Sequence, residues 1–179
     1  MIRAETWEGD LVEFLNSYRY QPDLTRKLDA LCSASFDQET INEIVLWKVN
    51  RYAPLAPEAL TALDRASRFS AGQHRDAKEV VAVLLDQPGV DLPMASTFLR
   101  FRNSLTFQII DRHAYRAVTG DDYPLYSTSK DKDKINLYFN YLDQLHELAR
   151  IKSLQFESLD RILYVFDKQK NGPLRIALK

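Results

Sequence analysis

Residues 84–120 of this 179-residue chain read LLDQPGVDLPMASTFLRFRNSLTFQIIDRHAYRAVTG. Apolar residues at helical spacing lie on both sides of Pro88 and Gly89. Proline fixes its own φ and glycine tolerates positive φ, so this pair favours a tight turn. The stretch therefore predicts a helix over about 75–86, a turn at 87–91 and a second helix directly after the turn.

The second half of this stretch predicts an extended connection and one more helix. Residues 105–110 have strand-like composition but no partner run elsewhere, so an extended connection is expected there. Asp111 is a good N-cap for a short helix that ends at Gly120.

Apolar residues three and four positions apart predict further helices outside this stretch. Prolines at helix starts and one glycine after a helix end support their limits. The chain has only five glycines, about 3% against a usual ~7%, which disfavours the many tight turns of sheet proteins. Nine helices and an all-α fold are expected. The helices outside the stretch cover about 11–19, 22–31, 38–53, 57–71, 130–150 and 159–166.

Length, composition and charge bound the class of protein. The chain is long enough for one independent core, and 45% hydrophobic with 27% charged residues is ordinary globular usage. The formal net charge is −1. A nucleic-acid partner would therefore be met by a local basic patch rather than by the field of the whole protein.

The cysteine count and the apolar runs suggest a compartment. Cys32 is the only cysteine, so an intrachain disulfide and an iron–sulfur cluster held by this chain alone are excluded, and a reducing cytoplasm is expected. The longest apolar run, Val80 to Leu85, is far shorter than the roughly 20 residues that cross a bilayer. No membrane partner and no signal peptide are expected.

The motifs in residues 84–120 resemble the helix-hairpin-helix segment of the base-excision DNA glycosylase superfamily (HhH-GPD). In that family a Leu-Pro-Gly-Val-Gly hairpin joins two helices, and an aspartate, a histidine and an arginine follow some way downstream. The matching positions here are Pro88, Gly89 and Val90 in the hairpin, Ala95 in the second helix, and Asp111, His113, Arg116 and Val118 in the later run.

The resemblance implies a two-lobed helical fold with a cleft between the lobes. One lobe would cover about 37–110 and end in the helix-hairpin-helix at 75–102. The other would combine about 1–36 with 111–179.

The resemblance also implies an activity on double-stranded DNA. A hairpin that opens a helix presents unpaired N–H groups to a phosphate. A carboxylate, here Asp111, would stabilise the positive charge on the sugar as a flipped base leaves, or activate a water. The expected DNA-binding residues are Pro88, Gly89, Val90, Asp91, Leu92 and Met94 in the hairpin, Lys48, Asn50 and Arg51 at the end of the third helix, and Arg112.

Three departures from the family pattern narrow the activity. Pro93 stands where lyase-type relatives have a lysine, so a Schiff-base step through that position is excluded. Asp91 replaces the second hairpin glycine and brings a carboxylate close to the expected phosphate. No four-cysteine set follows, and the histidines at 74, 113 and 146 form no short ligand motif. A cluster-free member with no cofactor and no metal is expected.

Each candidate residue also has a purely structural interpretation. Helix capping by itself explains an aspartate at position 111, and His113 is expected as a surface or cap-adjacent histidine. Trp47 is expected to be buried, with Lys48 and Arg51 exposed. The aromatic residues at 138, 139 and 141 fit a core stripe.

Basic residues give two local excesses of positive charge. Four arginines against Asp91 and Asp111 give +2 between 89 and 119: Arg100, Arg102, Arg112 and Arg116. The tail from 168 adds +4 from Lys168, Lys170, Arg175 and Lys179, and a solvated face is the expected role of this tail.

The leading hypothesis is monofunctional hydrolysis of an N-glycosidic bond by a DNA glycosylase-like protein. Two alternatives stay open. One is a helix-hairpin-helix protein that binds DNA without chemistry, and the other is a helical protein-interaction domain.

Overall fold

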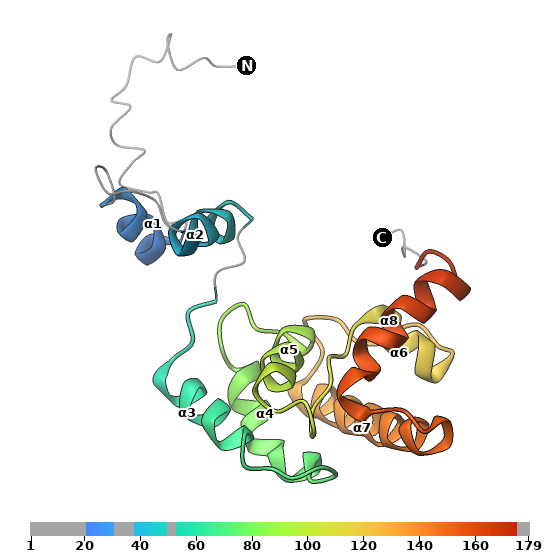
Figure 1. Ribbon diagram of the computed structural model, residues 1–179. Coiled ribbons are helices and arrows are strands. Elements are labelled where there is room, and N and C mark those ends of the chain that lie inside the picture. The colour runs from blue at the N-terminus through green and yellow to red at the C-terminus, as the bar shows by residue number, and fades with distance from the viewer. Residues whose placement is uncertain (1–20, 31–37, 50–52, 175–179) are drawn as a thin grey trace. The chain divides into compact units, whose positions relative to one another are not determined.

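The computed structural model describes residues 21–30, 38–49 and 53–174 of the chain (Figure 1). In these ranges all regular secondary structure is helical, with eight α-helices, two 3-10 helices and no strand. The all-α prediction is therefore confirmed, while the helix predicted over 11–19 lies outside the described residues.

The helices follow one another with short connections. Their bounds are α1 Pro22–Asp29, α2 Gln38–Lys48, α3 Pro57–Ala66, η3 His74–Ala77, α4 Lys78–Leu85, α5 Leu92–Arg102, α6 Arg112–Thr119, α7 Asp131–Lys152, η4 Phe156–Ser158 and α8 Leu159–Lys170. None of these helices has the length and apolar composition that crossing a membrane requires.

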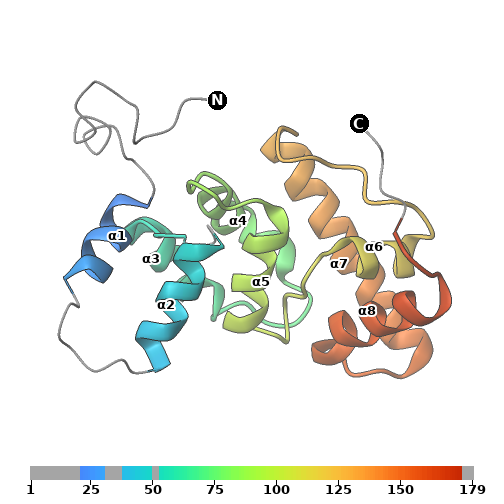
Figure 2. The ribbon, with the colours of Figure 1, turned by 90° about the horizontal axis from the view of Figure 1, so that it is seen from above.

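The chain divides into two compact units, Met1–Ala53 and Pro54–Lys179. In the first unit α1 packs against α2 (Figures 1 and 2). Leu24 is buried there, and the indole Nε1 of half-buried Trp47 donates to Thr25 Oγ1 at 2.9 Å. The two lobes expected from the family resemblance stay a prediction.

The second unit is organised around the long helix α7, which contacts α4, α5 and α6 (Figure 2). Tyr138 and Tyr141 of α7 are buried, as the predicted core stripe requires. Their hydroxyls donate to the carbonyls of Gln108 at 2.9 Å and Ile109 at 3.0 Å. These bonds satisfy two backbone carbonyls of the extended connection at 105–110, which lies between α5 and α6.

Two helices end earlier than the sequence predicts. The helix predicted over 38–53 is α2 and ends at Lys48. The helix predicted over 57–71 is α3 and ends at Ala66. The carbonyls of Ala66 and Phe69 instead accept from Asn103 Nδ2 at 3.0 and 2.8 Å, so a side chain from the end of α5 takes the place of further helical bonds.

Candidate functional site

The turn between α4 and α5 forms where the sequence predicts it. Gly89 has φ +78°, a left-handed conformation that glycine adopts without strain, and Val90 N donates to Gln87 O at 3.1 Å. The Gln87 side chain fixes the turn from behind, because its Oε1 accepts from Ala56 N at 3.0 Å and its Nε2 donates to Val83 O at 3.1 Å. The turn is therefore tied both to α4 and to the segment before α3.

The amides of two hairpin residues expected to bind DNA, Leu92 and Met94, have partners inside the protein. Leu92 N donates to the Asp91 carboxylate at 2.8 Å, and Met94 N donates to the Asp91 carbonyl at 2.9 Å. In the described part of the chain, the amides of Gly89 and Asp91 have no acceptor. Pro88 and Gly89 are exposed, whereas the side chains of Val90 and Leu92 belong to the core.

Two groups bind the Asp91 carboxylate. Its Oδ1 caps α5 through Leu92 N and lies 2.9 Å from Lys134 Nζ. Lys134 is buried in the first turn of α7 and also donates to Ser127 O at 2.9 Å. The carboxylate that sequence reasoning placed near a phosphate is thus ion-paired.

Asp111 is the N-cap of α6, as its structural interpretation predicts. Its Oδ1 accepts from Ala114 N at 2.8 Å, and its carbonyl accepts from Tyr115 N at 2.9 Å. No donor from the described ranges meets its other oxygen, Oδ2. The half-buried carboxylate therefore keeps one oxygen for a ligand.

A cavity of about 510 Å³ brings Asp111 and the turn together. Its walls come from the start of α5, the start of α6 and the loop before α7. The lining residues are Asp91, Pro93, Asp111, Arg112, Tyr123, Leu125, Tyr126, Ser127 and Thr128. A smaller cavity of about 190 Å³, lined by Ile109, Asp160, Arg161, Tyr164 and Val165, also borders Asp111.

The loop at 121–130 supplies most of the cavity wall and was missed by sequence reasoning. Tyr123 is half-buried, and burial together with the nearby Asp91 carboxylate raises its pKa well above the ordinary value. Tyr126 is 61% exposed, so its ring is open to a stacking ligand. Two tyrosines in a short polar loop with a proline were the available signal.

Asp167 of α8 gathers three side chains around a fully buried carboxylate. It accepts from Arg116 Nε and Nη2 at 3.0 and 2.8 Å and from Asn171 Nδ2 at 2.7 Å, and it lies 2.7 Å from His113 Nδ1. Burial alone would raise the pKa of Asp167, but the hydrogen bonds from Arg116, Asn171 and His113 lower it to about 2.

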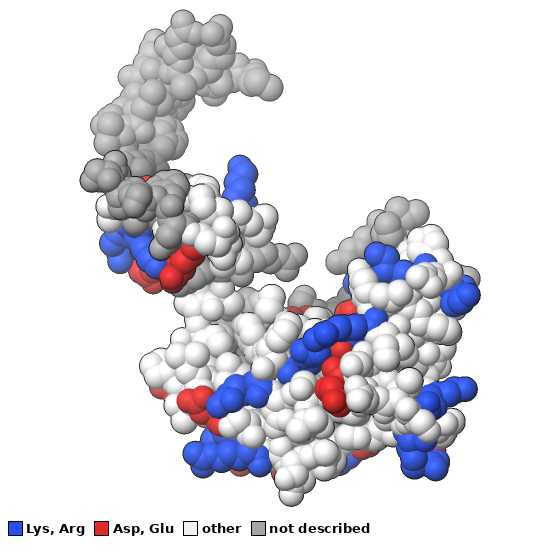
Figure 3. Space-filling view, in the orientation of Figure 1, with Lys and Arg blue, Asp and Glu red and all other residues white. Residues whose placement is uncertain are grey.

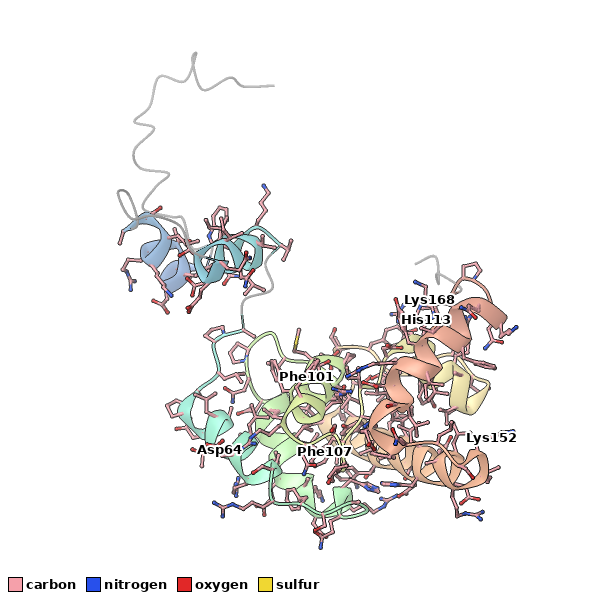
Figure 4. All side chains as sticks on the ribbon, in the orientation of Figure 1. Asp64, Phe101, Phe107, His113, Lys152 and Lys168 are labelled. Atoms are coloured by element: carbon pink, nitrogen blue, oxygen red, sulfur yellow. The ribbon has the colours of Figure 1, made fainter. Side chains whose placement is uncertain are left out.

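His113 is cap-adjacent, as one form of the expectation has it, because it is the second residue of α6 after the N-cap Asp111. Its side chain is 19% exposed and packs from α6 toward α8, with the ring edge 5.1 Å from the Tyr164 ring between centroids. Figure 4 labels His113. Together with Arg116 it belongs to the contact between the two helices.

The expected basic excess between 89 and 119 is not a surface patch. Arg100 is buried and its Nε lies 3.1 Å from Asp160, while Arg116 is bound to Asp167. Arg102 Nη2 lies 3.3 Å from Asp64. On the face drawn in Figure 3, Lys and Arg side chains lie in separate small groups. Of the four arginines, the exposed Arg112 is the one that lines the large cavity.

The residues predicted on the third helix belong to the first unit, Met1–Ala53, and the cavity belongs to the second. Lys48 is exposed at the end of α2 in the first unit. Asn50 and Arg51 lie outside the described residues. Their role toward DNA stays a prediction.

Comparison of the chain with protein-family models, with curated proteins and with solved structures gave no match in any of the three. Within the described ranges, no three histidine, cysteine or acidic side chains are grouped so that they could hold a metal ion. The cavity and the residues that line it are therefore the features of the molecule that bear on its function.

Proposed function

We propose that the protein is a DNA glycosylase-like enzyme of the helix-hairpin-helix type, which hydrolyses the N-glycosidic bond of a flipped base. The observation that carries the proposal is that Asp111 and two residues at the start of α5, Asp91 and Pro93, line one cavity. Its volume of about 510 Å³ falls in the range of small-molecule sites, so a single base fits by size.

The cavity has the groups that base excision needs. A flipped base would stack on Tyr126 and Tyr123, since aromatic rings hold bases without regard to sequence. The bond between the sugar C1′ and the base nitrogen breaks, and its electron pair leaves with the base. The Asp111 carboxylate stabilises the positive charge left on the sugar and takes the proton of the water that adds to C1′.

The same wall favours hydrolysis without strand cleavage. Pro93 lines the cavity at the position of the family's lyase lysine and has no amine. The expected product is an abasic site in an intact strand.

Few groups of the protein are expected to bind the DNA backbone. The free amides of Gly89 and Asp91 would bind one phosphate, and Arg112 lies at the cavity. The net charge is −1, and most arginines of α5 and α6 are paired with carboxylates inside the protein. DNA binding should therefore release few counterions, and the affinity for DNA should fall only slowly as the salt concentration rises.

The test is base release from a panel of duplexes that each carry one damaged or mismatched base. After incubation with wild-type protein, hot alkali should cleave the labelled strand of at least one duplex at the abasic site, and without alkali the strand should stay intact. Binding without any release would favour the non-catalytic alternative, which the capping role of Asp111 Oδ1 supports. Absence of binding even at low salt would select the protein-interaction alternative and overturn the proposal.

A further inference from the structure

Lys134 lies where the turn, the cavity wall and α7 meet. Its side chain is 7% exposed. The ammonium lies 2.9 Å from Asp91 Oδ1, donates to Ser127 O at 2.9 Å, and lies 3.8 Å from Asp131 of its own helix. A buried ammonium requires such partners, because leaving it without them is costly.

We propose that Lys134 is a positioning residue that neutralises Asp91, so that the turn between α4 and α5 accepts a DNA phosphate despite its carboxylate. This inference rests on the proposed function, since it needs DNA at the turn.

Asp91 lies at the end of the turn that would bind the phosphate. Its carboxylate caps the same helix start whose neighbouring amides, those of Gly89 and Asp91, are free to bind an anion. An unpaired carboxylate there would repel a phosphate, and this repulsion is strong where water is partly excluded. The ammonium at 2.9 Å makes the pair neutral.

The same lysine also orders the cavity wall. Ser127 and Thr128 line the cavity, and the Ser127 carbonyl is bound to Lys134 Nζ. Loss of the lysine therefore has two separable effects, one on the charge at the turn and one on the loop. Removal of the Asp91 charge reverses only the first.

The experiment measures binding to a duplex with one tetrahydrofuran abasic analogue, by fluorescence anisotropy at low salt. Lys134→Met should bind about tenfold more weakly than wild type. The double variant Asp91→Asn/Lys134→Met should bind more tightly than Lys134→Met, since neither charge is left, and the affinity that it does not recover measures the effect on the loop. The control Lys132→Met removes one positive charge from an exposed position in the first turn of α7, and this variant should bind the duplex like wild type.

The inference is overturned if Lys134→Met binds like wild type, or if the double variant binds no better than Lys134→Met. If Lys134→Met does not fold, the duplex affinity of the single variant Asp91→Asn tests the inference by itself. In Asp91→Asn the asparagine side-chain oxygen can still accept from Leu92 N. The Lys134 ammonium then has no carboxylate at the turn to neutralise, so this variant should bind the duplex more tightly than wild type. Weaker binding of the duplex by Asp91→Asn overturns the inference. Absence of binding by the wild-type protein would instead contradict the proposed function itself.

Discussion

Arg116 meets Asp167 at two points, with Nε and Nη2 donating to its two carboxylate oxygens at 3.0 and 2.8 Å. The pair joins α6 to α8, and Asp111 is the residue that begins α6. The ion pair therefore fixes the helix that carries the candidate catalytic carboxylate.

Asp167→Asn should destabilise the protein by about 3 kcal/mol or more, because it leaves the partly buried Arg116 guanidinium without its counter-charge. The measurement is urea unfolding followed by circular dichroism. Asp133→Asn, an exposed change of the same chemistry in α7, should leave the midpoint unchanged. A cost below about 1 kcal/mol for Asp167→Asn would contradict the buried pair.

Low pH should reduce the free energy of unfolding through the Asp167 carboxylate. The pKa of Asp167 is lowered from 3.8 to about 2, so the folded state binds fewer protons than the unfolded state between these values. The resulting stabilisation, about 2 kcal/mol, is present above pH 4 and is lost as the pH falls through about 2. Unfolding free energies measured from pH 5 to pH 2 should fall more steeply for wild type than for Asp167→Asn. Parallel curves would contradict this assignment.

Two stacked histidines should give a second pH dependence at milder acidity. His146 stacks on Phe156 at 4.0 Å and on His74 at 5.5 Å between ring centroids, and burial lowers the pKa of both histidines. The unfolded state then binds more protons below about pH 6.5, so stability falls as the pH drops through that value.

His146→Phe removes one of these groups and its unbonded, buried Nε2 while keeping an aromatic ring on Phe156. Its unfolding free energy should change less than that of wild type between pH 7 and pH 5, as measured by urea unfolding at each pH. An unchanged pH dependence would exclude His146 as a contributor.

Gly89→Ala should cost about 1–2 kcal/mol of stability, since φ is +78° and a Cβ meets nothing within 4 Å, which leaves backbone strain as the cause. Gly72→Ala is a matched control, because Gly72 has φ +84° and equally open surroundings. Both variants should lose similar stability in urea. Only Gly89→Ala should weaken binding to the abasic duplex, and equal binding losses would argue against the turn as the DNA contact.

Local sequence patterns predicted the helices well because capping and apolar spacing act within a few residues. Pro88, Gly89 and Asp111 mark element limits that the structure shares. The limit of α3 was wrong, because Asn103 binds the carbonyls of Ala66 and Phe69 from far along the chain.

The site was predictable only in part, for the same reason. The turn and Asp111 stand out in the sequence. No local pattern shows that two arginines form ion pairs with carboxylates of α8, Arg100 with Asp160 and Arg116 with Asp167. Lys134 ends the run KDKDK at 130–134. Such a mixed run of charges by itself favours a solvated helix start, and only tertiary packing places Lys134 against Asp91. Tertiary pairing thus removed charges expected at the surface and added a lysine to the site.

The rate of base release by Asp111→Asn tests the central claim most directly. Asparagine caps helices about as well as aspartate, so α6 and the duplex affinity should be retained. Loss of the carboxylate should slow release by about a hundredfold or more on the substrate that wild type processes, while Asp133→Asn keeps the wild-type rate. Release by Asp111→Asn at the wild-type rate would contradict the account.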